Sequence, residues 1–144
     1  MPALSFDPKT VELKPIAEVI GARIKNPELR AKMLPMMEKD GNLSSAVVDD
    51  SDNLAMGVGT WDEGMWVAEP IPVLFDEVLV VVTGEMCAII DGEKLSAKEG
   101  ELLYIPANNK VRFGSDIGAK IVWITSPPSW AAFDKAYEEG RLNP

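Results

Sequence analysis

Short runs of β-branched and aromatic residues alternate with Gly, Pro, Asp and Asn along the chain from residue 44 onward. This spacing is typical of an all-β sandwich or barrel, because each run has the length of one strand and each break has the residues of a turn. Asp91-Gly92 is the clearest turn, since both positions of a two-residue hairpin need positive φ. We predict strands at 45–49, 55–61, 65–68, 77–83, 85–90, 93–97, 101–105, 110–113 and 120–125.

Residues 1–43 lack this alternation and show helical spacing, with many Lys, Glu and Pro residues. We interpret them as an N-terminal arm in front of a barrel at 44–144. Asn26 and Pro27 have the residue types of an N-cap and a first helical position, so we expect a helix to start there. Gly41 is expected to end it.

Two further patterns concern the helices. Pro35 lies inside the arm helix and is expected to kink or shorten it. After the barrel, Ser129 is expected to cap a last helix, in which Trp130, Phe133 and Tyr137 are spaced to form one apolar stripe. The stripe predicts a C-terminal helix that packs on the barrel.

The net charge of the chain limits the classes of partner that it can bind. In 144 residues, 14 Lys and Arg stand against 23 Asp and Glu, which gives a formal net charge of -9. Phosphate backbones and anionic membranes repel such a chain, so we expect neither nucleic acid nor membrane as a partner. No run approaches the about 18 apolar residues of a membrane span. The single cysteine, Cys87, cannot form an internal disulfide, which favours a reducing compartment, and we expect the cytoplasm.

The chain has no histidine. Imidazole is therefore unavailable as general base, proton shuttle or metal ligand, which excludes Ser-His triads and His-based metal sites. Any chemistry must use Asp, Glu, Tyr, Lys, Arg or the single thiol.

Two groups of residues have the spacing of a known double motif. Glu77 stands at the start of one predicted strand, and Gly84 follows after six residues. Gly100 is followed after five residues by Pro106, with Asn108 two positions beyond. This arrangement resembles the two motifs of the cupin superfamily. With the helical patterns above, it implies an all-β cupin fold, a double-stranded β-helix or jelly-roll barrel, with a short N-terminal helical arm and a C-terminal helix.

The chain departs from the cupin pattern at the metal ligands. Residues 70–73 fill the stretch where the resemblance would place a His-x-His pair, and Val111 stands where the second motif would place a histidine. Glu77 is the one ligand position retained, and a single carboxylate does not hold a transition metal at useful affinity. We therefore predict no metal and no cofactor.

A narrower resemblance covers the region from Trp61 to Trp130. It rests on the runs Phe75-Asp76-Glu77, Tyr104-Ile105-Pro106, Arg112-Phe113-Gly114 and Ser126-Pro127-Pro128-Ser129-Trp130. These runs resemble the cupin domain of the ethanolamine-utilisation EutQ proteins, which also lack the histidines. The resemblance implies an association with ethanolamine-utilisation microcompartments, a homodimer and an acetate kinase activity. The chain has no phosphate-binding loop of the G-x-x-x-x-G-K type, which weighs against the kinase.

Glu77 is the first candidate for catalysis. If it points into the barrel, as the ligand glutamate of cupins does, Leu79 follows it inward by strand alternation. Apolar surroundings raise the pKa of such a carboxyl toward the range of general acid-base catalysis. The hypothesis is a lyase, isomerase or dehydratase acting on a small carbonyl or hydroxy compound, with Tyr104 as a second acid. Lys110 or Arg112 would then neutralise a substrate carboxylate.

Carboxylates and aromatic residues before this strand are candidates for ligand binding at the mouth of the barrel. Glu63 and Glu69 lie close in sequence to Trp61 and Trp66, and Trp123 occupies a later strand. Each tryptophan could equally serve the core or a dimer interface, and Glu63 could belong to a solvated turn.

Structural alternatives remain for the catalytic candidates as well. Glu77 could form an ion pair with Arg112 or Lys110, and Tyr104 could be a core aromatic residue. Two classes of function stay open on this basis. The protein is either a metal-independent enzyme that binds a small molecule, or a ligand-binding or assembly subunit without turnover.

Overall fold

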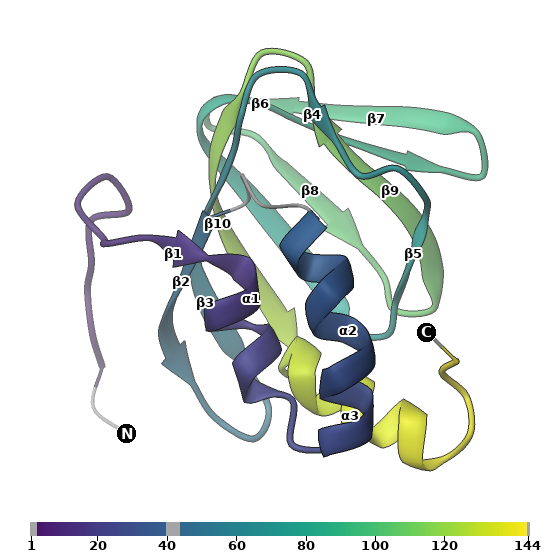
Figure 1. The fold of residues 1–144 in the computed structure, drawn as a ribbon. Helices are drawn as coiled ribbons and strands as arrows, with labels where there is room; N and C mark the ends of the chain where they lie inside the picture. Colours follow the sequence, from purple (N-terminus) through teal and green to yellow (C-terminus); the bar gives the residue numbers. More distant parts are fainter. Residues whose placement is uncertain (1–2, 40–43, 144) are drawn as a thin grey trace.

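The computed structural model describes residues 3–39 and 44–143, and this part of the chain is mostly β (Figure 1). Its strands are β1 Lys14–Pro15, β2 Ser44–Asp50, β3 Ala55–Trp61, β4 Met65–Trp66, β5 Ile71–Val73, β6 Asp76–Ile90, β7 Glu93–Lys98, β8 Leu102–Ile105, β9 Asn109–Ser115 and β10 Ala119–Ser126. Its helices are α1 Ile16–Val19, the 3-10 helix η1 Gly21–Arg23, α2 Pro27–Lys39 and α3 Ser129–Glu138.

The strands form one curled antiparallel sheet with the order β1-β2-β3-β10-β6-β9-β4, to which β5 adds on β9 and β7 and β8 add on β6. The long strand β6 holds this sheet together. Its first half pairs with β10 and β8, and its second half pairs with β7 and β9. The predicted all-β barrel is therefore present, with β6 common to both of its halves.

The two strands predicted on either side of Gly84 are one continuous strand. Gly84 has a φ of +81°, and a Cβ at this position would lie 2.0 Å from the carbonyl oxygen of Gly118. The glycine therefore lets the backbone of β6 come close to the turn before β10, and the chain does not reverse there. Asp91 and Gly92 have φ values of 52° and 78°, which confirms the predicted hairpin between β6 and β7.

The edge of the sheet differs from the prediction in two places. The strand expected over 65–68 is reduced to the two residues of β4. The three-residue strand β5, which pairs with β9, was not predicted. Its sequence contains Pro72 and directly follows Pro70, and proline occurs in sheets mainly at edges, so the propensity of this stretch is poor.

The arm helix α2 starts as predicted. The side-chain oxygen of Asn26 accepts hydrogen bonds from the backbone N–H groups of Glu28 (3.0 Å) and Leu29 (3.1 Å), which is the geometry of an N-cap. The helix continues through Pro35 to Lys39, so Pro35 does not shorten it, and the predicted alternative of a kink stays a prediction. The predicted stop at Gly41 lies outside the described residues.

The C-terminal helix α3 is also present, with a different start. Pro128 occupies the N-cap position and Ser129 is already helical, with no side-chain capping bond. The capping role predicted for Ser129 was therefore wrong. Trp130 and Phe133 are buried in the common core, as the apolar stripe predicted. Among the described helices, none is long and apolar enough to cross a membrane.

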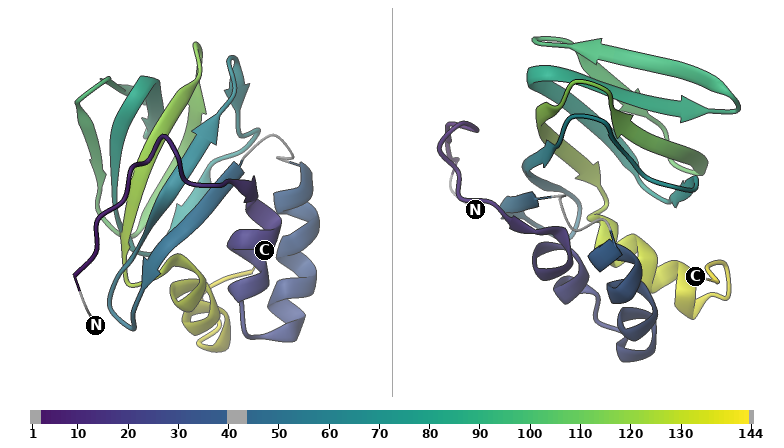
Figure 2. Two further views of the ribbon diagram at one scale, coloured as in Figure 1. Left: turned by 90° about the vertical axis from the view of Figure 1, so that its left-hand side faces the viewer. Right: turned by 45° about the horizontal axis from the view of Figure 1, so that its top comes forward.

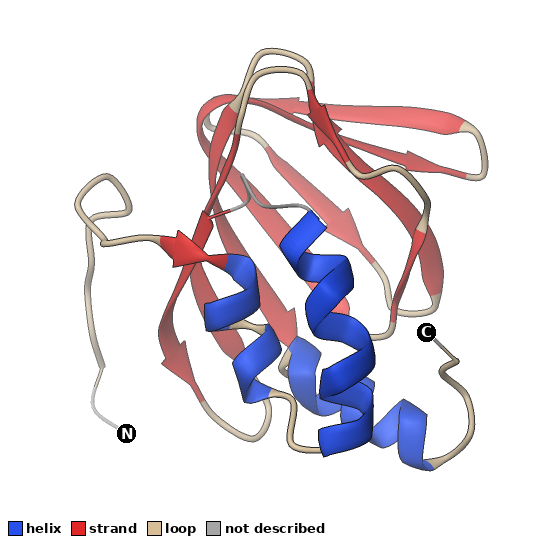
Figure 3. Cartoon of the chain, in the orientation of Figure 1, coloured by secondary structure: helices blue, strands red, loops and turns tan. Residues whose placement is uncertain are grey.

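The helices gather at one end of the sheet, on the side away from the β6–β7 hairpin (Figures 2 and 3). Asp134 of α3 connects this group to the arm. Its buried carboxylate accepts hydrogen bonds from the backbone N–H groups of Lys25 (2.8 Å) and Asn26 (2.9 Å), just before α2. Ile24 and Leu29 on either side are fully buried in the same core as the barrel. The arm and α3 therefore pack as a common cover for this end of the sheet.

Replacing Asp134 tests this attachment. Asp134→Ala leaves the partly buried N–H groups of Lys25 and Asn26 without their acceptor, so we expect the free energy of unfolding to fall by about 1 to 3 kcal/mol. Lys135→Ala, a change at the exposed neighbouring position on the same helix, should stay within about 0.5 kcal/mol. Urea unfolding followed by tryptophan fluorescence measures both. Equal effects of the two changes would show that the carboxylate does not fix the arm.

Candidate functional site

A cavity of about 490 Å³ lies between the inner face of the sheet and the helices. Its wall is almost entirely hydrocarbon, and no Lys or Arg belongs to it among the residues that the structure describes. Strands β3, β6 and β10 form one side, while α1, α2 and α3 supply the cover. The cover contributes chiefly Ile16, Ile20, Met33, Met36, Met37, Phe133 and Leu142.

Glu77 lines this cavity from β6, as predicted. It lies opposite Ile105 of β8 and Thr125 of β10 in the register of the sheet. Within the described part of the chain, its carboxyl takes part in no hydrogen bond or ion pair. Removal from water without a compensating partner raises the pKa of the Glu77 carboxyl from 4.5 to about 8. At neutral pH this group is therefore mostly protonated and uncharged.

Thr125 is a second polar group in the cavity wall, and it was not among the predicted site residues. It is 2% exposed, and its hydroxyl oxygen has no hydrogen-bond partner among the described residues. It continues the inward series Ile121, Trp123 and Thr125 on β10. Strand alternation in the sequence therefore placed a threonine on the inner face, directly across from Glu77.

Two of the predicted tryptophans line the cavity. Trp61 lies at the end of β3, with its ring centre 6.4 Å from that of Phe113. Trp123 is buried, and its Nε1–H donates to the hydroxyl of Ser45 at 2.9 Å. Ser45 in turn donates to the carbonyl oxygen of Val58 at 3.0 Å. These bonds use the polar atoms of Trp123 and Ser45, so both residues present mainly hydrocarbon to the cavity.

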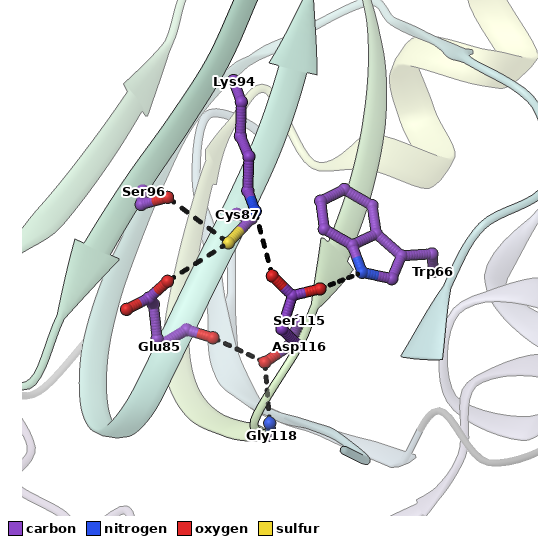
Figure 4. Close-up of polar contacts among 8 residues, drawn as sticks. All are labelled: Trp66, Glu85, Cys87, Lys94, Ser96, Ser115, Asp116 and Gly118. Atoms are coloured by element: carbon purple, nitrogen blue, oxygen red, sulfur yellow. Dashed lines mark hydrogen bonds and ion pairs between the residues drawn. The ribbon is translucent and has the colours of Figure 1, made fainter. Parts of the chain in front are cut away.

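Trp66 does not line the cavity. Its polar contacts are drawn in Figure 4. Its Nε1–H donates to Asp116 at 2.9 Å, and the other oxygen of that carboxylate binds the Lys94 ammonium at 2.9 Å. The ring also lies 5.5 Å from the Lys94 ammonium and 5.3 Å from the Arg112 guanidinium, within the range of cation–π contacts. A Cβ at Gly114 would overlap the indole, so this glycine makes room for Trp66.

A second polar group beside this cluster ties the turn between β9 and β10 to β6 (Figure 4). The buried hydroxyl of Ser115 donates to the carbonyl oxygen of Glu85 at 2.6 Å and accepts from the N–H of Gly118 at 2.9 Å. Cys87 is buried next to it, with its sulfur 3.5 Å from the hydroxyl of Ser96. Both contacts stabilise the sheet and lie apart from the cavity wall.

The remaining candidates are not brought together with Glu77. Tyr104 is 56% exposed on the outer side of β8, opposite Val78, and does not line the cavity. The structure therefore gives no support to Tyr104 as the second acid or as a core aromatic residue. Arg112 donates through Nε to the carbonyl oxygen of Val67 at 2.8 Å, on the face of β9 opposite to the cavity. The ion pair of Glu77 with Arg112, proposed as a structural alternative, is absent.

The exposed charged candidates also differ in whether they line the cavity. Lys110 and Glu63 are exposed and do not contribute to the cavity wall. Glu69 is exposed too, but it lies at the rim of the cavity. The predicted set of ligand-binding residues is therefore reduced to Trp61, Glu69 and Trp123, together with Glu77.

The residues present do not fit the metal site that cupins have at this position. Val111 is fully buried among apolar neighbours, and β5 supplies Ile71, Pro72 and Val73 where nitrogen donors would be needed. No group of three or more Cys, Asp or Glu side chains in the described ranges is arranged to hold a metal ion. Glu77 is thus a carboxyl without neighbouring ligands, and its chemistry is that of a proton donor or acceptor.

Comparisons with known proteins agree with the family resemblance. The family model described as "Ethanolamine utilisation protein EutQ" matches residues 37–132. "Acetate kinase EutQ" of Clostridioides difficile (strain 630) is 40% identical over 58 residues, which cover 40% of this chain and 37% of that protein. The protein of the same name from Escherichia coli (strain K12) is 27% identical over 82 residues, covering 57% and 34%. The matched stretches span about a third of the length of these relatives.

Solved structures support the same fold. The Clostridium difficile EutQ protein superposes with a TM-score of 0.58 at 29% identity, over 65% of this chain and 71% of that chain. A cupin superfamily protein from Desulfitobacterium hafniense DCB-2 gives a TM-score of 0.55 at 19% identity, over 60% and 78%. The second match is informative about the fold alone, and it confirms the predicted cupin double-stranded β-helix.

Glu77→Gln tests the protonation of the cavity carboxyl, because it keeps the shape of the side chain and removes its titration. The pKa of Glu77 is higher in the native protein, at about 8, than the 4.5 of the unfolded chain, so the native state binds the proton more tightly. The stabilisation is fully present below pH 4.5, falls as the pH rises, and is lost above about 8. We expect the wild type to lose about 4 kcal/mol more than the variant between pH 5 and pH 9.

Urea unfolding at pH 5, 7 and 9 measures this difference. Glu93→Gln, which removes an exposed carboxyl from β7, is the matched control and should follow the wild type. Parallel curves for the wild type and Glu77→Gln would mean that Glu77 is ionised at neutral pH.

Proposed function

The chain belongs to the EutQ family of ethanolamine-utilisation proteins, and on that basis we propose that it binds a small organic molecule in the cavity, with Glu77 exchanging a proton with that molecule. The observation that carries this proposal is a carboxyl without a partner in an apolar cavity. With a pKa of about 8, both protonation states of Glu77 are accessible near neutral pH, which suits a general acid or base.

The reaction that fits one carboxyl is a proton transfer on a carbonyl or hydroxy compound. In an isomerase, the Glu77 carboxylate removes a proton from the carbon next to a carbonyl, and the resulting acid returns it at another atom. In a dehydratase or lyase, the same acid protonates the leaving group. Both reactions return Glu77 to its starting protonation state without a further reactant. Neither reaction therefore needs Tyr104 as a second acid.

An acetate kinase is the activity named for the curated relatives, and the cavity gives it less support. Phosphoryl transfer depends on positive groups that neutralise the phosphates. The described cavity wall has no Lys or Arg and carries the two carboxyls Glu69 and Glu77. An acetyl phosphate or a nucleotide would lose its hydration there without gaining a cation as partner. A ligand-binding or assembly subunit without turnover is the second candidate, because an apolar cavity serves binding alone equally well.

Two expectations from the sequence stay proposals. The homodimer follows from the family resemblance, and Leu102 and Tyr104, which are exposed side by side on the outer face, offer apolar surface to a second copy. The cytoplasmic location follows from the use of a single unpaired cysteine.

Binding in the cavity is tested with an uncharged fluorescent probe, N-phenyl-1-naphthylamine, whose emission rises in apolar surroundings. Gly59 lines the cavity, and a Cβ there meets Trp123 at an ordinary contact distance of 3.5 Å. We expect Gly59→Leu to raise the dissociation constant at least about tenfold by filling the cavity, with Gly59→Ala within about threefold of the wild type. Equal binding by all three proteins would place the probe elsewhere.

Turnover is tested by screening small carbonyl and hydroxy compounds for conversion by the purified protein. For any compound converted, we expect Glu77→Gln to reduce kcat by about 10²-fold or more, while its affinity stays within about threefold. Tyr104→Phe, at the exposed position, should leave kcat unchanged. Retained turnover in Glu77→Gln would remove Glu77 from the mechanism, and a screen without conversion would favour the binding subunit.

A further inference from the structure

The polar atoms of the cavity are unequally distributed. Two groups of its wall, the Glu77 carboxyl and the Thr125 hydroxyl, have no partner among the described residues and lie on neighbouring strands in direct register. Thr125 is buried and Glu77 is half-buried. Ser129, at the start of α3, also lines the cavity, and its hydroxyl forms no hydrogen bond within the described part of the chain. The remaining polar side chains of the wall are half-buried or exposed or, in Ser45, already bonded.

A buried polar atom without a partner is rare in folded proteins, and here its position is informative. The Thr125 side chain lines the same cavity as Glu77, and its hydroxyl oxygen is buried. Trp123 and Ser45, which lie near it on the inner face, use their polar atoms on each other. A ligand oxygen is therefore the partner that the fold leaves open for Thr125 and Glu77.

The charge of the wall decides what kind of ligand group fits. An anion would find no cation there and would stand beside a carboxyl. An ammonium group would need Glu77 to be ionised, and the desolvation of both ions in an apolar cavity opposes that pair. A neutral hydroxyl or carbonyl avoids both costs, because a protonated carboxyl donates a hydrogen bond and a threonine hydroxyl donates or accepts one.

We propose that Glu77 and Thr125 together recognise one neutral oxygen group, a hydroxyl or a carbonyl, on a ligand whose remainder is hydrocarbon. This inference rests on the proposed function and adds the chemical class of the ligand. The rest of the wall, from Leu79 and Ile121 to the methionines of α2, buries the hydrocarbon part. A volume of about 490 Å³ lies within the range of small-molecule sites.

The test is displacement of N-phenyl-1-naphthylamine at pH 7 by four compounds with the same chain: 1-octanol, 2-octanone, octylamine and octyl phosphate. We expect 1-octanol and 2-octanone to displace the probe at concentrations at least tenfold lower than the amine and the phosphate. Equal potency of the four compounds, or preference for either charged compound, would overturn the inference. Failure of the probe and of every compound to bind would overturn the proposed function with it.

The role of Thr125 is tested with a valine substitution and a matched control at another threonine. Thr125→Val keeps the shape of the side chain and removes the hydroxyl, so we expect it to weaken binding of 1-octanol threefold to tenfold while the probe, which has no oxygen, binds as before. Thr83→Val makes the same change at an exposed position of β6 and should have no effect. Unchanged 1-octanol binding in Thr125→Val would show that the hydroxyl does not contact the ligand.

Discussion

The desolvation of Glu77 is the physical constraint to which the other features of the site are related. A carboxyl at the wall of an open barrel would be hydrated and ionised, and its chemistry would be that of a surface acid. Here the helices lie over that end of the barrel, and burial in the protein raises the pKa of the group. The cover is held in turn by the carboxylate of Asp134, which binds the two N–H groups ahead of α2. A buried carboxyl group with hydrogen-bond partners thus helps to create the surroundings of another carboxyl that has none among the described residues.

The same constraint explains why the residues around Glu77 are apolar. A cupin that holds a metal needs an inner face rich in nitrogen donors, and its glutamate is ionised by the metal. In this chain Val111 and Val73 are buried on the inner face, so no positive charge is available to Glu77. The hydrocarbon in place of nitrogen donors leaves Glu77 without a charged partner among the described residues, which raises the pKa of its carboxyl. It also gives the cavity an almost entirely apolar wall.

Most of the fold could be predicted from local sequence. The alternation of apolar and polar residues predicted the strands, the Asp91-Gly92 pair predicted the hairpin, and Asn26 predicted the start of α2. Each of these signals depends on a few neighbouring residues. Strand β5 was not predicted, because Pro70 before it and Pro72 within it give the stretch a low strand propensity. The bonds from Lys25 and Asn26 to Asp134 span 109 and 108 residues and depend on tertiary packing, so no local pattern indicates them.

The structure brings only part of the candidate site together. Motif spacing indicated Glu77, which lines the cavity, whereas Tyr104 and Arg112 were chosen for their chemistry without regard to the face of their strands. Once Ile105 and Val111 are inward, alternation directs both of those side chains outward. The same rule applied to β10 would have identified Thr125.

The two sides of the cavity differ in rigidity, which bears on how a ligand would be selected. The sheet side is held by the paired strands β3, β10 and β6. The opposite side consists of methionines of α2, whose flexible side chains adapt to different shapes. Such a wall discriminates weakly between hydrocarbon ligands of different outline. Selection then depends on the polar end of the ligand, where the positions of Glu77 and Thr125 are set by paired strands and do not adapt.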